Sequence, residues 1–167
     1  MSRDASVQDA IFAHLTGLGI AYDLVQHPPV QTIEDCAWAE HTLDAVVPKN
    51  LFLTPRNKSA YFLCITRPDA IFRTADVSKQ AGSSRLSFGE EQPLIEMLRT
   101  YPGAISPMGL IFPEASKMHL LIDRQLRTMP RLAFHPNDSA QTLAMAGEDF
   151  FDVFLPSTAH EVNWIDI

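Results

Sequence analysis

Apolar side chains recur at helical spacing in several stretches of the chain. In the first stretch Val7, Ile11, Leu15 and Leu18 lie three or four residues apart, directly after Ser6, a favoured helix-capping residue. Comparable signals predict helices over 7–18, 33–40, 75–81, 92–100 and 148–155.

Short apolar runs bounded by Pro, Gly, Asn or Ser lie between these helices, as is typical of strands. They predict strands over 21–27, 50–53, 60–66, 85–88, 109–112, 118–123, 131–135 and 161–167. Helices scatter among hairpins instead of alternating strictly with strands. The pattern therefore predicts an α+β fold with a mixed, mostly antiparallel sheet and helices packed around it.

Length and composition fit a single domain over residues 1–167. The chain has 46% hydrophobic and 20% charged residues, and no apolar run is long enough to span a membrane. The N-terminus lacks the basic-then-apolar pattern of a signal peptide. Two cysteines, Cys36 and Cys64, cannot form a disulfide framework, so we expect a reducing, cytoplasmic location and no membrane partner.

The net charge of -7 argues against a general nucleic-acid binder, but the charge is unevenly distributed. Residues 49–85 carry seven basic and two acidic side chains, a net charge of +5, whereas the segments on both sides are each -6. One interpretation is chance variation among solvated loops. The other is a local anion-facing surface, sufficient for contact with one end of a nucleic acid.

Lys49 interrupts the apolar run Val-Val-Pro-Lys-Asn-Leu-Phe-Leu, where a strand is predicted to begin. A lysine in this setting can extend its ammonium group to the surface while its stem covers apolar atoms. Alternatively, the strand end holds a cation that faces an anion or a polarised carbonyl.

Two glycines and two prolines fall within the eight residues 102–109, Pro-Gly-Ala-Ile-Ser-Pro-Met-Gly. Glycine permits close backbone approach and proline fixes the path, so exposed backbone amides here could bind an oxyanion. The stretch lacks the Gly-Lys-Ser/Thr ending of a P-loop, and many such stretches are simple turns. Ser106 lies in this stretch without the surroundings of a nucleophile elbow.

His135 follows a predicted strand and precedes a proline, a context in which histidine is structural or orients a substrate. The remaining histidines show no metal-binding spacing, so neither a metal nor another cofactor is expected. Cys36 and Cys64 also lack the surroundings of a catalytic nucleophile.

In order and spacing, four motifs resemble the prolyl-tRNA editing family of the YbaK/ProX type, which is related to the editing insertion domain of bacterial prolyl-tRNA synthetases. An early His27-Pro28-Pro29-Val30 segment adds to the likeness, above all to free-standing Ala-tRNA(Pro) deacylases. The motifs span Pro48–Leu53, Arg85–Phe88, Pro102–Leu110 and Phe134–Pro136.

The resemblance implies an aminoacyl-tRNA deacylase that removes a wrong amino acid, alanine first of all, from tRNA(Pro) by attack of water on the ester. Its pocket would exclude proline by size. The implied partners are the tRNA acceptor end and prolyl-tRNA synthetase. A non-catalytic module of the same fold, binding nucleic acid or a small ligand, is the alternative.

The family motifs and the basic segment together assign candidate roles. The expected catalytic residues are Lys49, Gly103, Ser106, Pro107 and His135. The expected substrate-binding residues are Asn50, Arg73, Arg85, Ala104, Ile105 and Thr142. One departure accompanies them: the family's Asn-Thr-Ala-Thr-like run is here Ser139-Ala140-Gln141-Thr142, in which only the last residue is retained.

Overall fold

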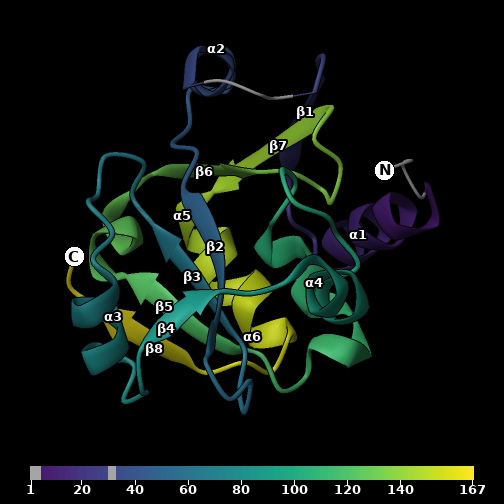
Figure 1. Cartoon of the computed structure of the whole chain (residues 1–167). Helices are drawn as coiled ribbons and strands as arrows, with labels where there is room; N and C mark the ends of the chain where they lie inside the picture. Colours follow the sequence, from purple (N-terminus) through teal and green to yellow (C-terminus); the bar gives the residue numbers. More distant parts are fainter. Residues whose placement is uncertain (1–4, 30–32) are drawn as a thin grey trace.

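Two β-sheets organise the chain, for which the computed structural model describes residues 5–29 and 33–167 (Figure 1). One sheet has three antiparallel strands in the order β1-β7-β6, and the other has five strands in the order β4-β2-β3-β5-β8. In the larger sheet β3, β5 and β8 run parallel, whereas β2 pairs antiparallel with both β3 and β4. The predicted α+β class with a mixed, mostly antiparallel arrangement is confirmed. Val30, the last residue of the HPPV segment, lies outside the described residues, as do residues 1–4.

Most predicted elements form, with small shifts at their ends. The strands are β1 Tyr22–Gln26, β2 Lys49–Pro55, β3 Phe62–Thr66, β4 Leu86–Phe88, β5 His119–Asp123, β6 Arg131–Phe134, β7 Gln141–Ala146 and β8 Val162–Ile165. The longer α-helices are α1 Ala5–Gly17, α2 Ile33–Leu43, α3 Thr74–Gln80 and α4 Glu91–Leu98. The helix predicted over 148–155 is a composite of α5 Gly147–Asp149, the π-helix η4 Phe150–Phe154 and α6 Leu155–Ser157. Shorter 3-10 helices are η1 Pro107–Ile111, η2 Pro113–Ala115 and η3 Arg124–Thr128.

The strand predicted over 109–112 is wrong, because these residues belong largely to η1. Ser106 caps this helix by accepting a hydrogen bond from the backbone N–H of Met108, and Pro107 occupies its first turn. Gly109 lies so close to α4 that a Cβ there would overlap the carbonyl oxygen of Leu98. Helix η1 is therefore held against α4 by a contact that requires glycine.

The main hydrophobic core joins the two sheets and includes side chains from α1, α4 and η1, for example Ile11, Leu98 and Met108. A second cluster lies on the face of the five-stranded sheet that α3 covers, where Leu53 and Leu86 contact Val77. A small third cluster lies between α2 and the three-stranded sheet. Figure 1 shows α2 at the opposite end of the molecule from α3.

A short connection links the two sheets at the point where β2 begins. Val46 forms a parallel bridge with Leu132 of β6, and two backbone hydrogen bonds hold it there. Three residues later Lys49 starts β2 in the five-stranded sheet. The start of β2 is therefore fixed relative to β6, which leads directly into His135.

Candidate functional site

Three polar side chains form a hydrogen-bonded chain on the three-stranded sheet. Thr142 of β7 lies 2.7 Å from His27 Nε2, measured at Oγ1, and 3.5 Å from His135 Nδ1. The two imidazole rings are 6.1 Å apart between centroids. Antiparallel pairing of β1 with β7 and of β7 with β6 brings these distant residues together.

Backbone carbonyls determine which ring nitrogen of each histidine carries the proton. His135 Nδ1 lies 2.6 Å from the carbonyl oxygen of Gln141, and His27 Nδ1 lies 2.8 Å from that of Pro28. Because a carbonyl can only accept, both Nδ1 atoms must donate. In the neutral state Thr142 then donates to His27 Nε2. His135 keeps an unprotonated Nε2, which has no hydrogen-bond partner within the described residues.

The environment keeps His135 neutral. Burial lowers the pKa of its imidazole, the nearby His27 lowers it further, and the Gln141 carbonyl and Asp138 act in the opposite direction. A neutral imidazole with a fixed tautomer is a hydrogen-bond acceptor and a general base at neutral pH.

A half-open cavity of about 290 Å³ adjoins this chain of side chains at His27. It lies between the end of β1 and helix α2, and its walls include Asp35 and Trp38. The Trp38 ring meets the His27 ring edge-on at 5.8 Å. A cavity of this volume accommodates a small organic group.

The predicted glycine loop, residues 103–107, offers backbone donors. Gly103 has φ +95°, a left-handed conformation that favours glycine. The N–H of Ala104 is already bonded to the Tyr101 carbonyl, and Pro107 has no N–H. In the described part of the chain the N–H groups of Gly103, Ile105 and Ser106 have no acceptor. Three amides of this loop are therefore unpaired in the described chain.

Side chains in this loop are mostly buried. Ala104, Ser106 and Pro107 are buried, and Ile105 packs against the main core. The Ser106 hydroxyl accepts from the Met108 N–H, so its side chain serves as a helix cap. Contributions from this loop to binding would therefore come chiefly from the backbone.

Tyr101 ties the glycine loop to the segment that follows His135. Its hydroxyl accepts a hydrogen bond from the Ser139 N–H at 2.9 Å and lies 3.1 Å from Ser139 Oγ. Asn137 Nδ2 also donates to the carbonyls of Leu98 and Arg99. The structure thus brings the glycine loop close to the segment that follows the Phe134–Pro136 motif. It also gives a structural role to residues 139–142, which differ from the family pattern.

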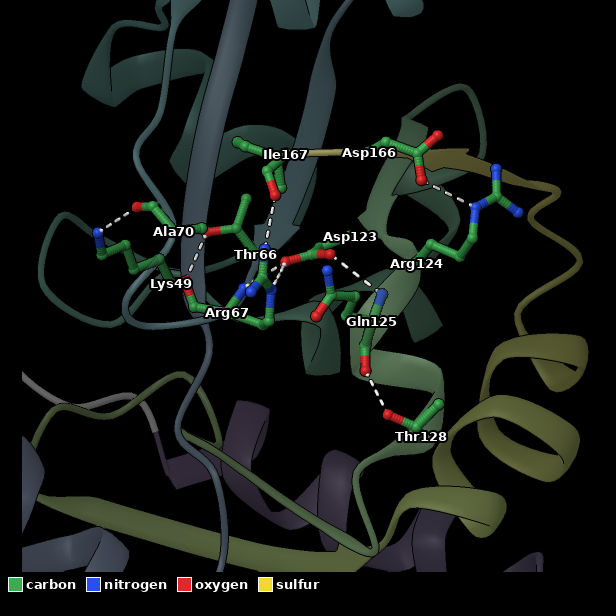
Figure 2. A network of polar contacts seen from close by, with 10 residues as sticks. All are labelled: Lys49, Thr66, Arg67, Ala70, Asp123, Arg124, Gln125, Thr128, Asp166 and Ile167. Atoms are coloured by element: carbon green, nitrogen blue, oxygen red, sulfur yellow. Dashed lines mark hydrogen bonds and ion pairs between the residues drawn. The ribbon is translucent and has the colours of Figure 1, made fainter.

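Lys49 lies on the other sheet, on the face that α3 covers. Its exposed side chain donates to the Ala70 carbonyl at 3.1 Å (Figure 2). Asn50 is directed to the opposite face, where its Nδ2 donates to the Pro48 carbonyl and its buried Oδ1 lacks a partner in the described chain. Unsatisfied buried acceptors are exceptions in native proteins. No described hydrogen bond joins Lys49 to His135 or to the glycine loop.

The loop that holds Lys49 is itself anchored. Arg67 begins this loop and forms a 2.7 Å ion pair with Asp123, whose side chain is buried (Figure 2). The same carboxylate accepts from the Arg67 and Gln125 backbone N–H groups. Ala70 N–H then donates to the Arg67 carbonyl. The Ala70 carbonyl that accepts from Lys49 is thus held in place through the buried carboxylate of Asp123.

The two predicted substrate arginines lie on either side of α3. Arg73 immediately precedes that helix and Arg85 immediately precedes β4, and both are exposed. Neither forms an ion pair with any described residue, whereas Arg124 and Arg127 pair with Asp166 and Asp152.

The cysteines do not offer a reactive thiolate. Burial raises the pKa of Cys64 to about 12. Burial also raises the pKa of Cys36, and the neighbouring Glu40 and Asp35 raise it further. No group of three or more potential metal ligands occurs in the part of the chain that the structure describes. Within those same limits, none of the helices has the length and apolar character needed to cross a membrane.

Sequence reasoning missed His27 and Tyr101 as site residues. His27 was noted only within the HPPV segment, since its partner Thr142 is 115 residues away. Tyr101 immediately precedes the glycine-rich stretch. Its place beside that motif was the available signal.

Comparison with known proteins finds related sequences that cover most of this chain. A model of the aminoacyl-tRNA editing domain matches residues 27–153. The prolyl-tRNA editing protein ProX of Acetoanaerobium sticklandii is 32% identical over 147 residues, which cover 87% of this chain and 89% of that protein. Prolyl-tRNA synthetase associated domain-containing protein 1 of Bos taurus is 29% identical, covering 94% of this chain and 93% of its own.

The fold agrees with these matches. A crystal structure of a proposed trans-editing enzyme for prolyl tRNA synthetase superposes with a TM-score of 0.70 at 14% identity, covering 99% of this chain and 98% of that one. The matched region contains the His27–Thr142–His135 chain, Lys49 and the glycine loop. This chain therefore belongs to the aminoacyl-tRNA editing domain family and, within it, to the prolyl-tRNA editing type.

Proposed function

We propose that this protein hydrolyses the ester bond that joins a wrongly attached small amino acid, above all alanine, to the 3′ end of tRNA(Pro). The observation that carries the proposal is His135, a neutral imidazole whose Nδ1 proton is fixed on the Gln141 carbonyl. His135 lies in the region that matches the editing family, and the neighbouring His27 lines a cavity suited to a small group.

In the proposed reaction His135 Nε2 takes a proton from a water molecule as the water oxygen attacks the ester carbonyl carbon. The N–H groups of Gly103, Ile105 and Ser106 stabilise the oxyanion that forms. The carbon–oxygen bond to the ribose then breaks, and the ribose oxygen receives the proton from His135. The products are a free amino acid and deacylated tRNA.

The other expected residues hold the substrate. The Lys49 ammonium positions the terminal phosphate or steadies developing charge, and Asn50 lies beside it on β2. Arg73 and Arg85 supply cations along the approach of the acceptor end, and Thr142 orients the histidines. No metal or other cofactor takes part. We place this activity in the cytoplasm, with prolyl-tRNA synthetase as a second partner.

The decisive experiment compares the deacylation of tRNA(Pro) charged with alanine, cysteine, serine or proline. We expect Ala-tRNA(Pro) to be cleared fastest and Pro-tRNA(Pro) to be spared, because the pocket excludes the larger ring. A His135→Ala variant with an unchanged melting curve is the control. Binding of these tRNAs without hydrolysis of any would favour the non-catalytic module instead.

A further inference from the structure

The two most exposed large apolar side chains of the described chain are Ile71 and Phe88, and neither lines the cavity beside His27. Ile71 is 70% exposed and Phe88 is 67% exposed. Phe72, which follows Ile71, places its ring 6.2 Å from that of Phe88. We refer to Ile71, Phe72 and Phe88 as the Ile71–Phe88 patch.

The patch is built into the fold on one side and open on the other. Phe72 packs against the cluster under α3 that includes Leu53 and Leu86. Phe88 ends β4, an edge strand, where it is paired with Leu53. Single exposed apolar residues are ordinary, but a group with two aromatic rings in contact is typical of a binding surface.

Cations border the patch. Arg73 directly follows Phe72, and Lys49 reaches the Ala70 carbonyl, one residue before Ile71. Arg85 lies at the other end of the short strand that carries Phe88. Lys49, Arg73 and Arg85 form no ion pair with described residues, although the whole chain has a net charge of -7. Three cations without acidic partners beside an apolar patch complement a polyanion, although the protein as a whole is acidic.

We propose that the Ile71–Phe88 patch binds unpaired nucleotides that precede the 3′-terminal nucleotide of an RNA, with a base stacked on Phe88 and phosphates contacting Arg73 and Lys49. Single-stranded RNA exposes flat bases between phosphates, and it is recognised by aromatic rings interleaved with cations. A purely apolar protein partner would leave these cations without counter-charges. That the RNA is tRNA(Pro) rests on the proposed function; the binding mode does not.

The test measures affinity and involves no chemistry. Fluorescence anisotropy compares uncharged tRNA(Pro) with the same tRNA lacking its 3′-terminal nucleotides, for wild type, Phe88→Ala and Phe88→Trp. Leu24→Ala is the matched control, because Leu24 is an exposed apolar residue on the other sheet. We expect Phe88→Ala to weaken binding of intact tRNA by about 5- to 100-fold. Phe88→Trp and Leu24→Ala should stay near wild type.

The truncated tRNA should bind more weakly to wild type and should not distinguish wild type from Phe88→Ala. Equal affinity of Phe88→Ala and wild type for intact tRNA overturns the proposal, and so does an equal loss on both tRNAs. If Phe88→Ala instead loses only prolyl-tRNA synthetase in a pull-down, the patch is a protein-docking surface. The proposed hydrolysis stands or falls separately, since its assay uses charged tRNA and His135→Ala.

Discussion

His135 and Lys49 make the same kind of contact in opposite surroundings. Each donates a hydrogen bond to a backbone carbonyl, His135 to that of Gln141 at 2.6 Å and Lys49 to that of Ala70 at 3.1 Å. Around His135 the contact is enclosed and burial lowers the imidazole pKa, whereas Lys49 is exposed. Because the His135 contact is buried, it fixes the tautomer of the imidazole. Because Lys49 is exposed, its ammonium group can leave the Ala70 carbonyl and bind a ligand instead.

The largest expected effect is on the exposed side of this comparison. Lys49→Ala should lower the single-turnover deacylation rate at saturating tRNA by about 10²–10³-fold, the scale for loss of one preorganised charged group. The melting temperature should barely change, because the lost hydrogen bond is exposed. Lys49→Arg should recover little, since a planar fork does not replace a compact ammonium. A folded Lys49→Ala protein with wild-type activity would show that this lysine only covers the surface.

The buried histidine, His135, predicts that activity depends on pH. Below the lowered pKa of His135, Nε2 is protonated and cannot accept a proton, so activity should fall on an acid limb centred below about pH 6.5. His27→Gln should move this limb upward, because His27 lowers the His135 pKa and Asp138 remains to raise it. Rates measured across the acid range test this. His14→Gln is the control, since burial also lowers the pKa of His14, which bonds Ser157 instead.

The pH dependence of stability should also reflect the lowered pKa of His135. The unfolded state binds more protons than the folded state between the lowered pKa and about pH 6.5, so unfolding free energy should rise with pH through that window. The contribution is complete above pH 6.5 and is lost as pH falls through the folded-state pKa. Urea titrations at several pH values should show a shallower dependence in His135→Gln. An unchanged slope would mean that His135 is not held neutral by the fold.

Loss of the Tyr101–Ser139 hydrogen bond should have a moderate effect on stability and on activity. Tyr101→Phe removes the acceptor for the buried Ser139 N–H, which should cost about 1–3 kcal/mol of unfolding free energy. Freed from Ser139, the glycine loop should also position its amides less well, with a rate loss of about tenfold. Urea unfolding and single-turnover kinetics measure the two effects. Full activity with reduced stability would limit Tyr101 to a structural role.

The salt dependence of tRNA binding should be shallow. With about two or three phosphate contacts, the slope of log affinity against log salt should be near -2 to -3. Charge reversal at Arg73 or Arg85 should weaken binding more than reversal at Arg124 or Arg127, which already have acidic partners. A much steeper slope would reveal a broad tRNA surface beyond the cations around α3.

The smallest expected effect comes from the thiols and from metal removal. The Cys36→Ala, Cys64→Ala double variant should retain wild-type deacylation, because neither thiol forms a thiolate readily. EDTA-treated wild type should retain it as well, because the proposed reaction uses no metal. Alanine is chosen because serine would bury a hydroxyl at Cys64. Loss of activity in a folded sample would reveal a thiol in the first case and a metal in the second.

Local patterns were sufficient for much of the fold. The β2–β3 hairpin was predictable because two apolar runs flank a polar turn, and α4 was predictable from helical spacing. Strand β7 was not, because Gln-Thr-Leu-Ala-Met-Ala has little strand propensity and owes its conformation to pairing with β1 and β6. Helix η1 escaped prediction for a related reason: Gly109 packs on α4, and that contact leaves no local mark.

The candidate site divides in the same way. Lys49, His135 and the glycine loop could be named from motifs in the order that the family resemblance gives them. The tautomer of His135 could not, since it depends on the Gln141 carbonyl across a turn and on Thr142. Arg73 was chosen from the charge distribution, and Arg85 from that distribution and the Arg85–Phe88 motif; the roles of both remain predictions.

The pairing of β1 with β7 also sets the order in which the molecule can assemble. Tyr22 pairs with Met145 and Val25 with Thr142, so the strand made first by the ribosome waits for one made near the end. At about 5–20 residues per second, several seconds separate the two partners. The five-stranded sheet also needs β8, but its β2–β3 hairpin can form early from neighbouring residues. A nascent chain would therefore carry its lysine on a formed hairpin before its histidines meet, and the proposed general base would be assembled among the last steps of folding.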